Sequence, residues 1–331
     1  MDGGLSFGLL LVLFLVLAAE FVNGWTDAPN AIATVVSTRV LSPRKAVLLA
    51  TLLNIVGAFA GTAVAATIGK GIVESSVINL TTVGAAMVSI VTWSTLAWRF
   101  GLPTSESHAL VSGLAGAALA TVGPEVLIWA GWQKVLIGLL FSTFLGFLGG
   151  WLIIVSIYRL FRKASPGRIR KLFGKLQILS AAFMAFGHGS NDGQKFIGAF
   201  TLALVLGGVL PEFKVSFEVI VLCSVVMGIG TSVGGWRIIK TMGMKIVKLE
   251  PYQGFAAETG AAVVIQLGSA FGIPLSTTHT INTAIMGAGS AKGLSAVRWG
   301  VVREVVLAWI LTFPVCGGIS WLVATVFQRI M

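Results

Sequence analysis

The stretch Asn23-Gly-Trp-Thr-Asp-Ala-Pro-Asn30 decides the fold, because it places an ionisable aspartate inside an apolar segment. On its N-terminal side Leu5 to Ala19 contains no charged residue, and on its other side Ala31 to Thr38 holds only apolar residues and small hydroxyls. A related stretch, His188-Gly-Ser-Asn-Asp-Gly-Gln-Lys195, occurs in a second apolar segment. An ionised carboxylate is costly in lipid and normally faces the interior of a helix bundle. The two stretches therefore predict a polytopic membrane protein with a polar centre.

The composition supports this class. Hydrophobic residues make up 56% of the 331 residues and charged residues 11%, whereas a soluble domain carries about 25% charged residues. The N-terminal apolar run lacks a basic region before it, so we interpret it as a retained first span and not as a signal peptide. Cys223 and Cys316 are isolated in apolar runs and are expected to be packing residues.

Apolar runs bounded by charges and turn residues predict the membrane segments. They lie at 5–38, 46–68, 77–98, 108–122, 134–158, 176–209, 217–239, 254–270, 279–290 and 300–328. Because Gly24, Pro29 and Gly193 disfavour a helix, we expect the first and sixth segments to break at the two quoted stretches. The segments 108–122 and 279–290 are too short to cross a bilayer of about 30 Å and are predicted to be half-helices preceded by re-entrant loops. The expected fold is all-α, with about 10–12 membrane segments.

The loop charges predict an orientation. Seven of the 23 basic residues lie in 159–175, which contains no acid, and cytoplasmic loops carry such an excess of Lys and Arg. We therefore expect both termini outside and residence in the cell (inner) membrane. The net charge of +11 is explained by these loops and does not indicate nucleic-acid binding. Lipid headgroups, a cytoplasmic regulator or a second copy of the chain are candidate partners of the basic loop, lipid being the simplest.

A second motif shows that the chain is duplicated. Gly101-Leu-Pro-Thr-Ser-Glu-Ser-His108 returns 171 residues later as Gly272-Ile-Pro-Leu-Ser-Thr-Thr-His279, and Asp192 follows Asp27 by 165 residues. Residues 1–158 and 176–331 are thus predicted to be two repeats joined by the linker 159–175. An odd number of spans in each repeat inverts the second one, which is the arrangement of many secondary transporters.

Each copy of the second motif ends where a short helix begins. Backbone N–H groups at a helix N-terminus, together with hydroxyl donors, bind phosphate-like anions. The predicted substrate ligands are Thr104, Ser105, Ser107, Ser276, Thr277 and Thr278, with Gln194 and Lys195 from the other stretch. These hydroxyls could alternatively serve only as helix caps, but their duplication opposite two aspartates favours an anion site. Three roles are open for Lys195: it pairs with the substrate anion, it takes the place of one bound cation, or it only neutralises Asp192.

Oxygen-bearing side chains are the candidates for the coupling ion. They are Asn23, Thr26, Asp27, Asn30, Asn191, Asp192 and Glu258. Such groups hold Na⁺ in broken-helix transporters, and the carboxyl groups could instead carry protons. Glu20 is also in an apolar run, with a basic loop residue as a candidate partner. His108 and His279 are supporting residues that either donate to an anion, relay protons or bond backbone carbonyls.

Several function classes are not supported by the sequence. It contains no Walker loop, no dinucleotide-binding spacing and no nucleophile–base pair. We therefore expect a protein that is not an enzyme and needs no organic cofactor.

Together these residues resemble the inorganic phosphate transporter (PiT) family. The stretches at 23–30 and 189–195 look like its duplicated signature, the pair at 101–108 and 272–279 like its second hallmark, and Gly254-Phe-Ala-Ala-Glu258-Thr like a further segment. The resemblance covers nearly the whole chain. It implies phosphate uptake coupled to Na⁺ or H⁺, with phosphate at the Ser/Thr motif and cations at the Asp/Asn motif. The chain departs from the family at Trp25-Thr26 and at Lys195, where asparagine is usual, and it lacks a large cytoplasmic insert.

The leading hypothesis is a cation-coupled symporter of inorganic phosphate that works by alternating access, with Na⁺ slightly favoured over H⁺. Transport of another oxyanion such as sulfate is an alternative. So is an uncoupled anion channel, although buried carboxylates on an anion path and an inverted duplication speak against a channel.

Overall fold

The computed structural model describes residues 6–74, 76 and 78–330. Residues 1–5 and 331, which belong to the predicted repeats, and residue 77, the predicted start of a segment, lie outside the described residues. The first half of the chain forms α1 (Phe7–Ser37), α2 (Pro43–Ala58), α3 (Ala63–Gly71), α4 (Leu80–Phe100), α5 (Glu106–Thr121), η1 (Pro124–Val126) and α6 (Trp129–Leu160).

The second half forms α7 (Pro166–His188), the π-helical turn η2 (Gly189–Gly193), α8 (Gln194–Leu206), α9 (Phe217–Val233), α10 (Trp236–Lys240), the π-helical turn η3 (Thr241–Lys245), α11 (Pro251–Ala270), α12 (Thr277–Ser290), η4 (Leu294–Ala296) and α13 (Trp299–Ile330). Among the described residues the only β pairing is an isolated bridge between Val73 and Leu127. The predicted all-α class is confirmed.

Four helices, α1, α4, α6 and α13, are long and apolar enough to cross a membrane. Two bent pairs also qualify when each pair is taken as one span: α2 with α3, bent by 69°, and α9 with α10 and η3, bent by 60°. The segments predicted to be short are α5 and α12, with 16 and 14 residues. The chain is an integral membrane protein.

The positions of the helix breaks differ from the prediction. The helix α1 continues through Gly24 and Pro29, and the stretch around Asp192 stays helical as the π-turn η2. The breaks instead lie at residues 59–62 and 234–235, inside the second span of each half. A π-turn accommodates one extra residue without ending a helix, and such turns are frequent at functional sites.

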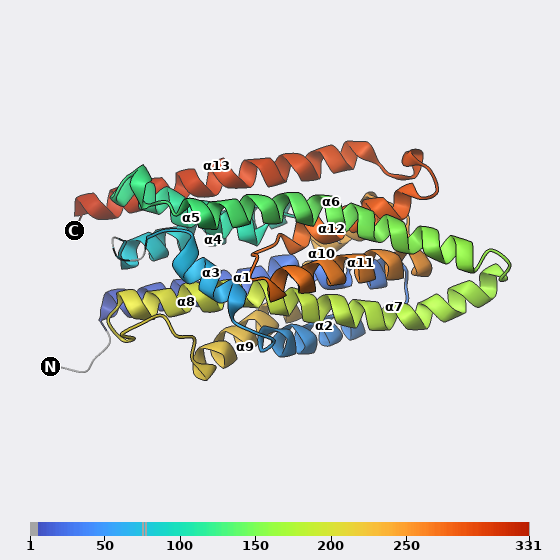
Figure 1. The fold of residues 1–331 in the computed structure, drawn as a ribbon, viewed down its shortest axis with the longest axis horizontal. Coiled ribbons are helices and arrows are strands. Elements are labelled where there is room, and N and C mark those ends of the chain that lie inside the picture. Colours follow the sequence, from blue (N-terminus) through green and yellow to red (C-terminus); the bar gives the residue numbers. More distant parts are fainter. Residues whose placement is uncertain (1–5, 75, 77, 331) are drawn as a thin grey trace.

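The bundle is elongated, and α1 begins at the end where α13 finishes, whereas α6 meets α7 at the opposite end (Figure 1). We call these the termini end and the linker end. The longest helices reach across the two halves, because α6 packs against α11 and α12 while α13 packs against α4 and α5.

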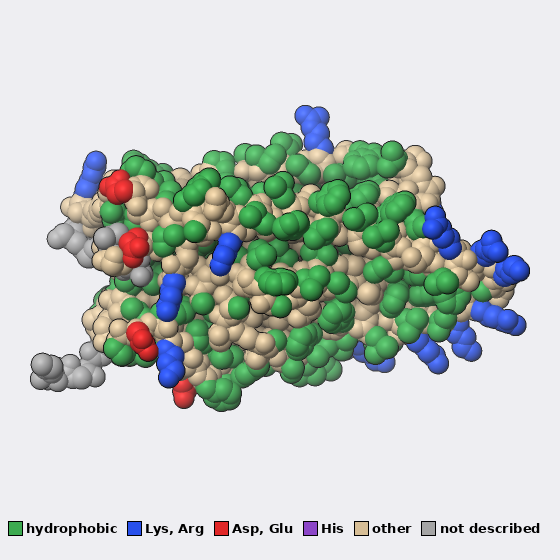
Figure 2. Space-filling model, viewed as in Figure 1, with side chains coloured by type: hydrophobic (Ala, Val, Ile, Leu, Met, Phe, Trp, Pro, Cys, Tyr) green, Lys and Arg blue, Asp and Glu red, His purple; other side chains and the backbone are tan. Residues whose placement is uncertain are grey.

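Charged side chains differ between the two ends (Figure 2). On the face shown, the linker end carries Lys and Arg and no Asp or Glu, whereas the termini end carries both signs. The region between them shows mainly green apolar side chains and tan surface, with an occasional Lys or Arg. Of the predicted linker 159–175, only 161–165 is non-helical, since α6 extends to Leu160 and α7 begins at Pro166.

Candidate functional site

The N-termini of α5 and α12 meet inside the bundle. Ser105 Oγ accepts a bond from His108 N at 3.3 Å, and Ser276 Oγ accepts one from His279 N at 3.2 Å, so the two equivalent serines cap the two helices. Ser107 Oγ donates to Leu275 O at 2.6 Å, which joins the tip of one motif to the tip of the other. The structure thus brings together the two copies that the sequence places 171 residues apart.

Lys195 lies at this junction and is fully buried. Its Nζ donates to Ser107 Oγ at 2.5 Å and to Leu275 O at 2.9 Å, and it forms an ion pair with Asp192. Of the three roles that the sequence left open, neutralising Asp192 is the one that this geometry displays. The same ammonium also contacts the hydroxyl and carbonyl groups at the two helix tips.

Hydroxyls of α12 connect both aspartates. Thr277 Oγ1 donates to Asp192 Oδ2 at 2.6 Å, and Thr278 Oγ1 donates to Asp27 Oδ2 at 3.2 Å. Asn30 Nδ2 donates to Thr278 Oγ1 at 2.9 Å. The first motif of α1, the second motif of α12 and the π-turn η2 therefore form one continuous polar network.

A group of potential metal ligands lies in this network. Asp27, His188 and Asp192 each offer one ligand atom, and these atoms lie within 4.8 Å of one another. His188 Nε2 is 3.1 Å from Asp192 Oδ2, and its Nδ1 is 3.2 Å from Asn54 Oδ1. The sequence places His188 one helical turn before Asp192 and predicts a structural supporting role for it, not a ligand role.

Two further carboxylates lie close to the network. Thr26 Oγ1 donates to Glu106 Oε1 at 3.1 Å, and Asn23 Nδ2 donates to Glu20 Oε2 at 2.9 Å. Glu20 therefore pairs with an amide of its own helix and not with a basic loop residue. From the sequence, Glu106 has no symmetric role, because its counterpart in the second copy is Thr277, but it is a candidate acceptor for a protonated phosphate.

Other predicted ligands bond elsewhere. Gln194 accepts a bond from Val64 N at 3.0 Å and donates to Ser190 O, so it caps α3 at the bend after α2. Asn191 Nδ2 donates to Ser269 Oγ at 3.0 Å. Thr104 is buried in the loop before α5.

Glu258 forms its own cluster, in which its carboxylate accepts bonds from Thr34, Ser180 and Gln177. Thr34 lies two turns after Asp27 on α1, so this carboxylate is displaced from the central network toward the linker end.

The two motif histidines contact each other. Their ring centroids are 4.6 Å apart with the rings nearly perpendicular, and His279 stacks on Trp309 of α13 at 3.7 Å. Trp309 Nε1 also donates to Pro103 O at 3.0 Å. The histidines thus fasten both helix tips to α13, which agrees with a supporting role.

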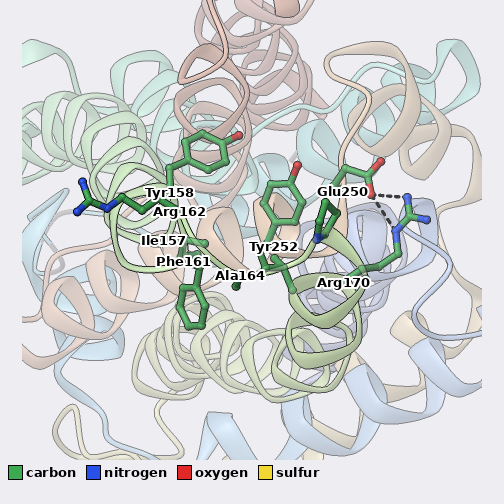
Figure 3. A pocket seen from close by; sticks show the side chains of 11 residues that line it. Ile157, Tyr158, Phe161, Arg162, Ala164, Arg170, Glu250 and Tyr252 are labelled. Atoms are coloured by element: carbon green, nitrogen blue, oxygen red, sulfur yellow. Dashed lines mark hydrogen bonds and ion pairs between the residues drawn. The ribbon is translucent and has the colours of Figure 1, made fainter.

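A pocket of about 540 Å³ lies away from this network, at the linker end (Figure 3). Tyr158 and Arg162 line it from α6 and the linker, and Arg170, Glu250 and Tyr252 from α7 and the start of α11. Arg170 donates to Glu250 at 2.7 Å, and this hydrogen bond raises the pKa of the guanidinium. The pocket contains none of the predicted site residues.

Comparison with known proteins identifies the family. The model of the family described as "Phosphate transporter family" matches residues 23–168 and 162–320. A probable low-affinity inorganic phosphate transporter of Rhizobium meliloti (strain 1021) is 43% identical over 97% of both chains. One of Bacillus subtilis (strain 168) is 38% identical over 92% of this chain and 93% of its own.

The fold has a solved counterpart. A structure titled "The sodium-dependent phosphate transporter" matches with a TM-score of 0.91 and 24% identity, covering 98% of this chain and 100% of that one. The resemblance seen in the sequence motifs is confirmed, and the members of the family are transporters and not enzymes. This chain belongs to the phosphate transporter family.

Proposed function

We propose that this protein imports inorganic phosphate together with Na⁺ by alternating access. The observation that carries the proposal is the meeting of the α5 and α12 N-termini, with their hydroxyls, at Lys195 and between Asp27 and Asp192. The names of the similar proteins support phosphate as the substrate.

The substrate site is formed by donors. Helix N-termini offer free N–H groups and a positive dipole end to an anion, and Ser107, Thr277 and Thr278 add hydroxyls. In the described geometry these hydroxyls bond Leu275 O and the two aspartates. Phosphate binding would turn them toward the anion, and Lys195 would supply one positive charge.

Cation coupling follows from the charges around that site. Asp27, Asp192 and Glu106 are buried acids, whereas Lys195 is the buried amine among them. A phosphate anion placed beside these acids is repelled unless further positive charge binds with it. The candidate ligands are mostly oxygens, which suits Na⁺, and the structural neighbour is described as sodium-dependent.

The orientation completes the proposal. Because Lys and Arg gather at the linker end, we place that end in the cytoplasm and both termini outside, in the cell membrane. The two halves act as inverted repeats, and each re-entrant helix closes the site from one side in turn.

Uptake of radiolabelled phosphate into proteoliposomes tests the proposal. The liposomes carry an inward Na⁺ gradient or an inward H⁺ gradient, and Asp27→Asn and Asp192→Asn are compared with wild type. We expect Na⁺-driven uptake that falls at least about tenfold in both variants, because each removes a charge needed to bind the cation. Glu218→Gln, which removes an exposed carboxylate at the start of α9, is the matched control and should transport normally.

Three results would contradict parts of the proposal. Uptake driven by the H⁺ gradient alone would show that protons, and not Na⁺, are the coupled ions. Sulfate uptake equal to phosphate uptake would contradict phosphate as the specific substrate. Phosphate flux that does not depend on either gradient and persists in both variants would indicate an uncoupled channel.

A further inference from the structure

Glu20 is a buried carboxylate that the proposed substrate site does not use. It is 0% exposed and precedes Asp27 by seven residues on α1. At 1.5 Å per residue it lies about 10 Å from Asp27 toward the termini end. Glu20, Asn23, Asp27 and Asn30 are three or four residues apart, so they form one polar stripe along the helix.

The contacts of Glu20 leave acceptors without donors. Asn23 Nδ2 donates to Glu20 Oε2 at 2.9 Å. The other carboxylate oxygen, Glu20 Oε1, and the amide oxygen, Asn23 Oδ1, are buried and have no hydrogen-bond partner among the residues that the structure describes. Each free oxygen is bonded to the same carbon as an atom of that hydrogen bond, so the two free oxygens flank one contact. Leaving such buried acceptors unpaired is energetically unfavourable.

Among the described residues, no basic side chain is free to neutralise Glu20. Lys195 is the ammonium within electrostatic range, and it is already paired with Asp192, while Glu106 adds further negative charge. The helix α9 passes so close to α1 that a Cβ on Gly24 would lie 2.2 Å from Met227 O. Because α1 and α9 pack this closely, a protein group has little room to turn toward the two free oxygens. A small cation is therefore the better partner for them.

We infer that Glu20 and Asn23 bind a Na⁺ ion at an outer cation site, separate from the central network. Both free ligand atoms are hard oxygens, and carbonyl groups or water complete the coordination. The site lies on the termini side of Asp27, where a cation that enters from outside arrives first. This inference rests on the proposed function, because it assigns one of the coupled ions.

Binding of ²²Na⁺ to the purified transporter in nanodiscs, without phosphate, tests the inference directly. Glu20→Gln keeps the side-chain volume and removes the charge. It should abolish one class of bound Na⁺ or weaken it at least about tenfold. In proteoliposomes, the Na⁺ concentration for half-maximal phosphate uptake should rise and the steepness of the Na⁺ dependence should fall. Glu218→Gln, at the same end of the bundle but exposed, should leave both measurements unchanged.

A second variant covers the case in which Glu20→Gln does not fold. Asn23→Asp keeps Glu20 and adds a second carboxylate, so it should bind Na⁺ more tightly. If wild-type uptake depends on Na⁺ but both variants bind Na⁺ with unchanged stoichiometry and affinity, the outer site is wrong and the proposed Na⁺ coupling still stands. A wild type that takes up phosphate with no Na⁺ binding would overturn the coupling ion as well.

Discussion

At the scale of single residues, Lys195 connects three elements at the centre of the molecule. Its Nζ contacts Asp192, Ser107 and Leu275 O, groups that come from η2, α5 and the loop before α12. A buried ion pair adds little net stability, but removing one partner leaves an uncompensated charge that costs about 3–5 kcal/mol. We therefore expect Lys195 to affect both stability and transport, and the two effects can be separated by the variants below.

Lys195→Met is expected to lower the thermal unfolding temperature and abolish phosphate uptake, because Asp192 is left buried and unpaired. The double variant Lys195→Met with Asp192→Asn should regain most of the stability but not the uptake. Lys214→Met, at an exposed lysine, serves as the control. Recovery of uptake together with stability would show that the lysine has only a structural role.

Thr277→Val keeps the shape of the side chain and removes the hydroxyl that donates to Asp192. Loss of one hydrogen bond to a charged group is worth about 1.5–3 kcal/mol, so phosphate uptake should need at least about tenfold more phosphate. Thr280→Val is the matched control one turn later, since Thr280 Oγ1 donates only to Ser276 O. Equal kinetics for the two variants would remove Thr277 from the site.

At the scale of elements, glycines set how closely the helices of the two halves cross. A Cβ on Gly24 of α1 would lie 2.2 Å from Met227 O of α9, and one on Gly57 of α2 would lie 2.2 Å from Phe186 O of α7. The two crossings use helices in equivalent places of the two halves, which supports the proposed duplication. They also keep both aspartate stretches tightly packed.

Gly24→Ala should destabilise the protein by about 1–3 kcal/mol, because a methyl group cannot fit against the α9 backbone without moving it. The comparison is Gly8→Ala, on the same helix, where nothing lies within 4 Å of the added carbon. Thermal unfolding in detergent measures both. A Gly24→Ala protein as stable as Gly8→Ala would show that the crossing is not rigid.

At the scale of the whole molecule, the charge difference between the ends predicts the orientation in the membrane. Both native cysteines are buried, so introduced cysteines report without interference. Lys214→Cys, between α8 and α9, should react with an impermeant maleimide in intact cells. Lys163→Cys, in the linker, should react only after the cells are permeabilised. The reverse labelling pattern would invert the proposed orientation.

The sequence was sufficient for the features that depend on hydrophobicity and repetition. Apolar run lengths predicted most helix boundaries within a few residues, although α7 begins ten residues before the predicted 176, and the repeated Pro-x-Ser motif predicted that Ser107 and Thr277 lie close together. Both follow from local composition and from the geometry that a duplication imposes.

Features that depend on packing were not predictable. Pro29 stays inside α1 although it removes a backbone donor, and the carbonyl it would have bonded, that of Trp25, packs closely on the backbone at Gly235. The π-turn at Asp192 and the pairing of Glu20 with Asn23 likewise depend on neighbouring helices that no single segment reveals. The cap that Gln194 forms on α3 was likewise not predictable, because it requires a bend in another span.

The packing of α6 and α13 against helices of the opposite half has a consequence for biogenesis. The helices α4 and α5 are synthesised early, yet the helix that packs against both is α13, at the C-terminal end. Domains usually fold as they emerge from the ribosome, N-terminal parts first. Here α5 can pack against α4 early but stays without α13 until translation is nearly finished. A ribosome that stops before Trp299 therefore releases a chain whose first half is complete in sequence but in which α4 and α5 lack the packing of α13.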